Sequence, residues 1–144
     1  MRVAVDTSVL LDVLGGDPVF GKASREALRR AYDRGPLCAG EVVWAEVSAR
    51  FEAEAPFLEA METLGIEYLA TSGAAAALAG AHWRRYHRNR AREAPGARRG
   101  AQRDKRVVAD FLVGAHAQLQ TDGLLARDRG FFRSHFKGLR LIEP

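Results

Sequence analysis

Short apolar runs alternate with longer amphipathic segments along this chain. The first run, Arg2–Asp6, is rich in β-branched residues and almost uniformly apolar, as expected for a strand buried on both faces. Similar runs predict further strands at Leu37–Ala39, Ile66–Ala70, Leu124–Ala126 and Arg140–Ile142. The intervening segments predict helices at Val9–Leu14, Ser24–Arg34, Glu41–Glu54, Pro56–Leu64, Ser72–Arg92 and Lys105–Gln120. This alternation favours a three-layer α/β/α fold with a parallel sheet of four or five strands.

The composition is that of a soluble globular protein. The chain has 144 residues, of which 47% are hydrophobic and 28% are charged, and we expect one domain over residues 1–144. No apolar run approaches the roughly 18 residues of a membrane span, and Asp6 interrupts the apolar N-terminus, which argues against a signal peptide. Cys38 is the only cysteine, so an intrachain disulfide and a cysteine-based zinc site are excluded. We therefore expect a cytoplasmic protein without membrane contact.

The net charge of +4 conceals a strong asymmetry. Ten basic and two acidic residues lie between Arg84 and Arg106, which gives this segment a charge of +8, whereas the rest of the chain carries −4. A concentrated basic segment on an acidic body is typical of a protein that binds a polyanion. The candidate RNA-binding residues are Arg98, Arg99, Arg103 and Arg106. The alternative is a solvated, arginine-rich surface that only increases solubility.

Two acids follow predicted strands. Asp6 is the last residue of the first strand, and Asp128 comes shortly after the fourth. In an open parallel sheet, ligands bind beyond the carboxyl ends of the strands, so both carboxylates are expected at one edge. Asp6 could instead cap the following helix, although Thr7 and Ser8 are equally suitable capping residues.

A third acid, Glu46, lies inside a predicted helix on a face of apolar and small residues. Its expected neighbours on that face are Val42, Val43, Ala49 and Ala53. A carboxylate is costly to bury there unless it is paired or binds a cation. The alternative is an ordinary surface glutamate at the edge of the helix.

A fourth acid, Asp110, lies off the apolar stripe of the helix Lys105–Gln120 and shares a face with Gly114 and Ala117. These small residues would let another element or a ligand approach closely. Asp104 is a weaker candidate for the same site.

Four carboxylates from strand ends and neighbouring helices suit a hard cation such as Mg²⁺ or Mn²⁺. A cluster of this charge requires a cation or protons to be stable. A bound metal lowers the pKa of a water molecule and stabilises a phosphodiester under attack.

Four segments, in order, resemble the motifs of the PIN-domain family: VAVDTSVLLDVL, VVWAEVSARF, VADFLVGAHA and DGLLARDRGFFRSHFKGLRLIEP. The similarity covers nearly the whole chain and is closest to the small, single-domain members that include VapC-type toxins. The resemblance implies that Asp6, Glu46, Asp110 and Asp128 are the catalytic acids that hold the divalent metal. It also implies that Thr7 or Ser8 supports a ligating carboxylate or water through its hydroxyl group.

The resemblance implies a metal-dependent endoribonuclease that leaves a 3′-hydroxyl and a 5′-phosphate, and the toxin half of a toxin–antitoxin pair. It further implies a homodimer and a cognate antitoxin protein that blocks the site. The chain departs from the family pattern at two positions. Ala126 stands where members often have threonine, and Gly130 stands where members often have a further aspartate.

Other functions fit the sequence less well. A dehalogenase-type phosphatase needs a second aspartate where Ser8 stands, a receiver domain needs an acidic pair beside Asp6, and a phosphate loop of the P-loop type is missing. The remaining alternative is a non-catalytic RNA-binding module of the same fold. Its stacking residues would be Trp83, Tyr86, Phe131 and Phe132. The four histidines show no metal-binding spacing, and His116 is expected at the surface or at an interface.

Overall fold

Five short strands form one parallel sheet at the centre of the computed structural model, which describes residues 1–93, 101–127 and 129–144, without the side chains of residues 93 and 101–106. The strands are β1 (Val3–Val5), β2 (Leu37–Ala39), β3 (Ile66–Tyr68), β4 (Gly123–Leu125) and β5 (Leu141–Ile142). Their spatial order is β3-β2-β1-β4-β5, and Ala4 of β1 aligns with Cys38 on one side and Leu124 on the other. The expected fold class is therefore confirmed, with five strands.

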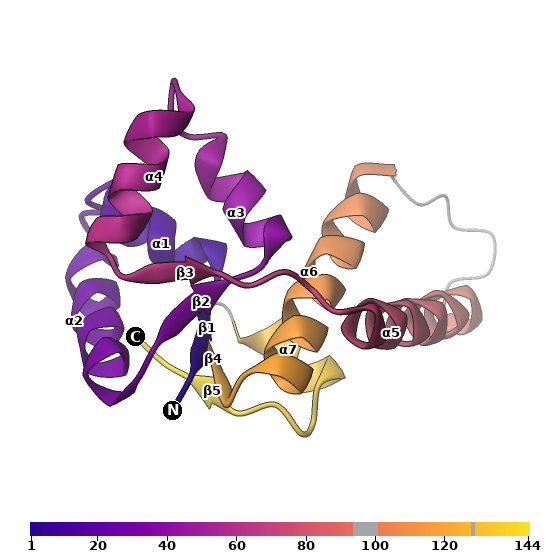
Figure 1. Ribbon diagram of the computed structural model, residues 1–144. Coiled ribbons are helices and arrows are strands. Elements are labelled where there is room, and N and C mark those ends of the chain that lie inside the picture. Colours follow the sequence, from indigo (N-terminus) through magenta and orange to yellow (C-terminus); the bar gives the residue numbers. More distant parts are fainter. Residues whose placement is uncertain (94–100, 128) are drawn as a thin grey trace.

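Helices cover both faces of this sheet. They are α1 (Thr7–Leu14), α2 (Gly21–Arg34), α3 (Glu41–Ser48), α4 (Glu54–Thr63), α5 (Gly73–Glu93), α6 (Ala101–Gln120) and α7 (Gly130–His135). The chain runs outward from β1 to β3 and then returns to β4, beside β1. Because parallel crossovers are right-handed, this reversal places the later helices on the opposite face. Figure 1 shows α1 and α2 on one side of the sheet and α5 and α6 on the other.

The reversal of strand order between β1 and β4 defines where a ligand can bind. Both strands are completely buried, with Val3, Val5 and Leu124 at 0–1% exposure. Apolar side chains on both faces leave no polar group within the strands themselves. Chemistry is therefore confined to the residues directly after the strands, at the crevice beside their carboxyl ends.

The prediction of one helix over Glu41–Glu54 was wrong. α3 ends at Ser48, and the N–H of Phe51 donates to the carbonyl of Ser48, as in the tight last turn of a helix. The chain then turns into α4, where the ring of Phe57 contacts those of both Trp44 and Phe51. Packing of these three aromatic rings compensates for the interruption of the helix.

Two further features differ from expectation. The sequence did not predict α7, whose Phe132 is buried. The Phe136 ring, directly after α7, packs on Gly114 of α6, so closely that a Cβ atom at Gly114 would overlap it. His116 is buried rather than at a surface or interface, with its Nε2 atom 2.8 Å from the carbonyl oxygen of Leu69.

None of the described helices is both long enough and apolar enough to cross a membrane.

Candidate active site

Asp6 stands at the junction of β1 and α1. Its N–H donates to the carbonyl of Leu125 (2.9 Å), so the β1–β4 ladder continues to this residue. Asp6 occupies the N-cap position of α1, but its side chain makes no capping hydrogen bond. The carboxylate instead accepts a hydrogen bond from the Ser8 hydroxyl at 2.9 Å. The Asp6 side chain therefore does not cap α1, which was the alternative role that the sequence allowed.

Glu46 lies on α3 and reaches the start of α1. Its Oε1 atom accepts a hydrogen bond from the Thr7 hydroxyl at 3.2 Å. The side chain is exposed, and because α3 ends at Ser48, the expected neighbours Ala49 and Ala53 do not continue its helical face. The argument from burial on an apolar face was thus wrong. Glu46 nevertheless lies beside Asp6, because consecutive hydroxyl residues link each carboxylate to the same turn.

The electrostatics of Asp6 reflect this position. Burial raises the pKa of its carboxyl group, the Ser8 hydroxyl opposes the shift, and the negative charge of Glu46 adds to it. Two mutually repelling carboxylates at a strand end favour a proton or a cation between them. Asp6 and Glu46, from segments far apart in the chain, are two of the four acids that were predicted to share one metal site.

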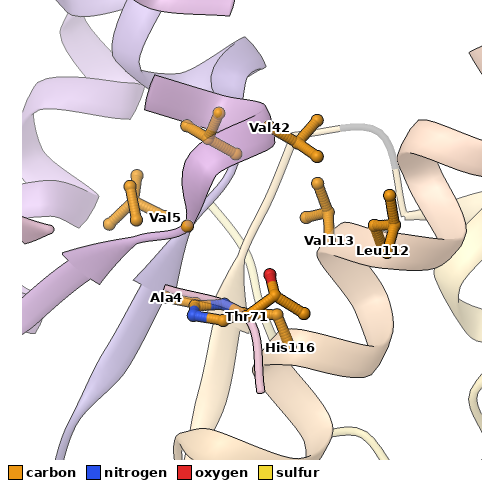
Figure 2. Close-up of a pocket in the computed structure, with 10 residues that line it drawn as sticks. Ala4, Val5, Val42, Thr71, Leu112, Val113 and His116 are labelled. Carbon is orange, nitrogen blue, oxygen red and sulfur yellow. The ribbon is translucent and has the colours of Figure 1, made fainter. Parts of the chain in front are cut away.

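Asp110 approaches from α6, where its side chain is half-buried. It comes one turn before Val113, which lines a small pocket together with Val5 of β1 and Val42 of α3 (Figure 2). α6 therefore packs across the carboxyl end of β1. The pocket has a volume of about 10 Å³, no more than one water molecule requires, and its lining is mostly apolar, so it serves as packing beneath the site.

Asp128 lies outside the described residues, but both of its neighbours are anchored. The Arg127 guanidinium forms two hydrogen bonds with the Asp12 carboxylate, Nε to Oδ2 at 2.9 Å and Nη2 to Oδ1 at 3.2 Å. Arg129 forms an ion pair with Glu143 near the C-terminus. The segment after β4 is therefore held from both sides of residue 128.

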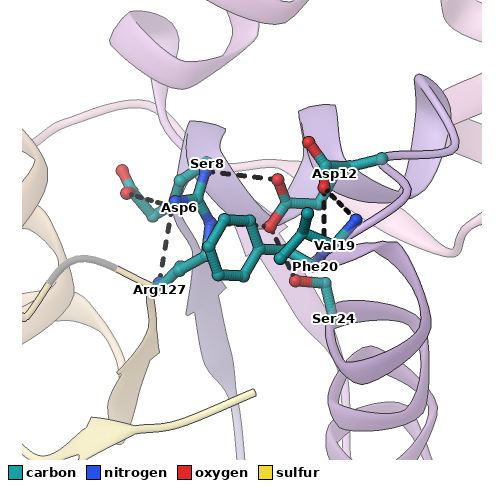
Figure 3. A network of polar contacts seen from close by, with 8 residues as sticks. Asp6, Ser8, Asp12, Val19, Phe20, Ser24 and Arg127 are labelled. Atoms are coloured by element: carbon teal, nitrogen blue, oxygen red, sulfur yellow. Dashed lines mark hydrogen bonds and ion pairs between the residues drawn. The ribbon is translucent and has the colours of Figure 1, made fainter.

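The Asp12–Arg127 pair belongs to a wider network (Figure 3). Asp12 is only 3% exposed, and its Oδ2 atom also accepts a hydrogen bond from the Ser24 hydroxyl at 2.8 Å. The Phe20 ring stacks on the Arg127 guanidinium, 4.1 Å from its Cζ atom. Ser8 connects this network to Asp6, because its Oγ atom also contacts the Arg127 N–H at 3.4 Å.

Sequence reasoning missed Asp12 and Arg127. The available indication was an aspartate among the apolar residues of the predicted helix Val9–Leu14, where a charge needs a partner. That partner lies 115 positions away, so the pattern alone does not identify it.

The site can supply oxygen ligands to a cation from Asp6 and Glu46. Among the described residues, however, no three histidine, cysteine or acidic side chains gather closely enough to hold a metal ion. Asp110, on α6, interacts with another group of the protein.

The side chains of all four predicted RNA-binding arginines lie outside the part of the chain that the structure describes. Arg98 and Arg99 lie outside the described residues, and Arg103 and Arg106 belong to α6 without described side chains. The basic segment begins on α5, where the side chains of Arg84, Arg85 and Arg88 are exposed.

Comparison with known proteins gives a family match and a set of similar folds. A family model described as the PIN domain matches residues 3–137. A search of curated proteins finds no match. Among solved structures, VapBC2 from Rickettsia felis bound to a DNA fragment from its promoter aligns with a TM-score of 0.69 at 13% identity, over 100% of this chain and 99% of that chain. DNA-bound VapBC from Salmonella typhimurium aligns with a TM-score of 0.64 at 17% identity, over 99% and 98%. FitAB bound to the IR36 DNA fragment aligns with a TM-score of 0.57 at 18% identity, over 99% and 94%.

Proposed function

Since this chain belongs to the PIN-domain family, we propose that it is a metal-dependent endoribonuclease, organised as a single nuclease domain over residues 1–144. The observation that carries the proposal is the meeting of Asp6 and Glu46 at the strand-order reversal, where each carboxylate accepts a hydrogen bond from a hydroxyl group of the first turn of α1. The proposed catalytic residues are Asp6, Glu46, Asp110 and Asp128.

The donors at this site suit Mg²⁺ or Mn²⁺, which prefer carboxylate oxygen atoms. Burial and the negative charge of Glu46 raise the pKa of Asp6, and a cation would offset the repulsion between the two carboxylates. A bound ion would lower the pKa of a water molecule and offset negative charge on the phosphodiester. Asp110 and Asp128 would complete the ligand set from α6 and from the segment after β4.

The neighbouring side chains keep these ligands in place. Ser8 donates to Asp6 and Thr7 donates to Glu46, which fixes the direction in which each carboxylate presents its free oxygen atoms. Arg127, held by Asp12, fixes the backbone directly before Asp128. A reactive arrangement of this kind depends on the positions of the ligands to within fractions of an ångström.

We further propose that the protein is the toxin of a toxin–antitoxin pair, acts in the cytoplasm as a homodimer, and is blocked by a cognate antitoxin. The support is the likeness of its fold to VapBC and FitAB structures over almost the whole chain. The RNA would contact the basic segment that includes Arg98, Arg99, Arg103 and Arg106.

The test is cleavage of a single-stranded RNA by the purified chain. We expect cleavage in Mg²⁺ or Mn²⁺, none after chelation, and recovery when the ion is returned. Asp6→Asn should abolish it, whereas Asp33→Asn, an exposed acid on α2, should not. If the chain binds RNA but cleaves it neither in Mg²⁺ nor in Mn²⁺, the result would favour the non-catalytic RNA-binding module instead.

Metal binding has a second measure that does not depend on activity. An ion that binds only the folded state stabilises the protein and so raises its melting temperature. At an ion concentration one hundred times the Kd, the gain in the free energy of unfolding is about 2.7 kcal/mol. We expect this increase for the wild type and for Asp33→Asn, but a smaller one for Asp6→Asn. Equal melting temperatures with and without Mn²⁺ would contradict the metal site.

A further inference from the structure

A polar groove lies between α5 and the segment from α7 to Lys137, apart from the carboxylate site. It has a volume of about 530 Å³ and is lined on one side by Arg85, Arg90 and Tyr86, and on the other by His135 and Lys137. Three of these side chains carry positive charge at neutral pH. Among the described residues, no carboxylate lines the groove.

The described side chains do not neutralise the positive charges in this groove. In the part of the chain that the structure describes, no acidic side chain forms an ion pair with Arg85, Arg90 or Lys137. Arg90 donates to the Tyr86 hydroxyl at 3.2 Å and lies over the Tyr86 ring, which holds its guanidinium at the wall of the groove. An arrangement of unpaired cations in a concave surface attracts an anion.

Two lining residues of the groove, Tyr86 and His135, pack on a buried ring of α6. The Phe111 ring contacts those of Tyr86 and His135, at centroid distances of 5.8 and 5.1 Å. Phe111 directly follows Asp110, and successive side chains on a helix diverge by about 100°. The same turn of α6 therefore carries Asp110, a proposed metal ligand, and the ring that supports the aromatic lining of the groove.

From these contacts we infer that the groove between α5 and Lys137 binds a phosphate group of the RNA strand whose neighbouring segment lies at the carboxylates. The inference rests on the proposed ribonuclease function. A site made of carboxylates repels phosphates, so the affinity for RNA must come from cations near it. Arg85 and Lys137 are exposed and face the groove from its two sides, as a clamp on a phosphodiester requires. Asn89 and Ser134 add neutral hydrogen-bonding groups.

The test measures binding without cleavage. A fluorescein-labelled single-stranded RNA is titrated with the full chain in EDTA, and anisotropy is followed at several salt concentrations. The groove variant carries Arg85→Gln and Lys137→Gln. The matched control carries Arg30→Gln and Lys22→Gln, which remove the same two charges from exposed positions of α2, on the other side of the sheet. Exposed substitutions cost less than about 0.5 kcal/mol, so both variants should fold.

We expect the groove variant to bind RNA roughly tenfold more weakly at about 0.1 M salt, with a log–log salt slope smaller by about 0.7 for each phosphate group that the variant no longer binds. The control should keep the wild-type slope. Equal reductions in affinity for the two variants would overturn the inference. The inference would also be overturned if inorganic phosphate or a polyglutamate peptide bound in a way that depends on Arg85 and Lys137, while RNA binding did not depend on these two residues.

A cleavage assay on the wild type in Mn²⁺ separates the two proposals. Cleavage by the wild type, together with unaltered RNA binding by the groove variant, would overturn only the groove. A wild type that neither cleaves nor binds RNA would overturn the ribonuclease function and the groove together.

Discussion

Asp12 and Arg127 form a two-bonded ion pair between α1 and the segment after β4, with the acid only 3% exposed and the arginine side chain 35% exposed. The planar guanidinium matches the carboxylate in a way that a lysine ammonium would not. The pair ties the first helix to the residue directly before Asp128. Its principal consequence is the position of Arg127 at the end of the described segment after β4.

Asp12→Asn tests this pair. The amide places an N–H group opposite the guanidinium, so one hydrogen bond is lost and the positive charge loses its partner. We expect a loss of about 2 kcal/mol in the free energy of unfolding and a lower cleavage rate. Urea denaturation measures the first and RNA cleavage the second. Asp33→Asn, at an exposed position, should change stability by less than about 0.5 kcal/mol. Identical unfolding midpoints for the two variants would refute the role of the pair.

Gly114 and Gly80 offer a matched test of packing on two helices. A Cβ atom at Gly114 would overlap the Phe136 ring, whereas one at Gly80 would meet nothing. Gly114→Ala should therefore destabilise the protein by about 1–3 kcal/mol, because the ring or the backbone must move. Gly80→Ala should stabilise it by about 0.5–1 kcal/mol through helix propensity. Thermal unfolding of both variants measures the difference. Shifts of the same sign would show that Phe136 does not restrict residue 114.

Much of the fold could be predicted from the sequence because its strands are buried on both faces. Val3–Val5 and Leu37–Ala39 are continuous apolar runs, which local pattern alone identifies. α7 could not be found in this way, because its position depends on the contact of Phe136 with Gly114, a tertiary interaction. The same holds for the break after Ser48, which the rings of Trp44 and Phe57 stabilise from separate helices.

Only those parts of the candidate site that follow from the order of strands and helices could be predicted. Parallel strands bring their carboxyl ends to one edge, so the place of Asp6 follows from the alternation of strands and helices. The partner of Asp12 does not follow, since nothing in the local pattern around Arg127 indicates an ion pair. The exposure of Glu46 also required the structure, because it depends on where α3 ends.

Three histidines predict how stability depends on pH. Burial lowers the pKa of His116, although the Leu69 carbonyl and Glu41 oppose the shift, and it also lowers the pKa values of His82 and His135. The unfolded chain, with histidine pKa values of about 6.5, therefore takes up protons first as the pH falls. The contribution of these histidines to the free energy of unfolding is therefore fully present above pH ~6.5, and it decreases as the pH falls from there towards their folded-state pKa values.

We expect a lower urea midpoint at pH ~5.5 than at pH ~7. His116→Gln can keep a hydrogen bond to the Leu69 carbonyl and has no proton to gain, so its midpoint should depend less on pH over this range. Parallel pH dependences for the wild type and His116→Gln would show that His116 is not a source of the effect.

The last prediction distinguishes a toxin from a passive RNA-binding protein. Expression of the wild-type chain alone in a bacterium should arrest growth. Asp110→Asn should be tolerated, whereas the control Asp33→Asn should arrest growth as the wild type does. The change at Asp110 is nearly isosteric, so packing on α6 should survive, but it removes one negative charge and a proposed metal ligand. A protein that acts only by occupying RNA predicts the opposite, because the loss of a negative charge near a polyanion leaves binding intact or strengthens it. Growth is followed at equal soluble levels of each protein. Arrest by both the wild type and Asp110→Asn would contradict a nuclease toxin, and the absence of arrest by either would contradict the toxin role while leaving cleavage to be judged by the RNA assay.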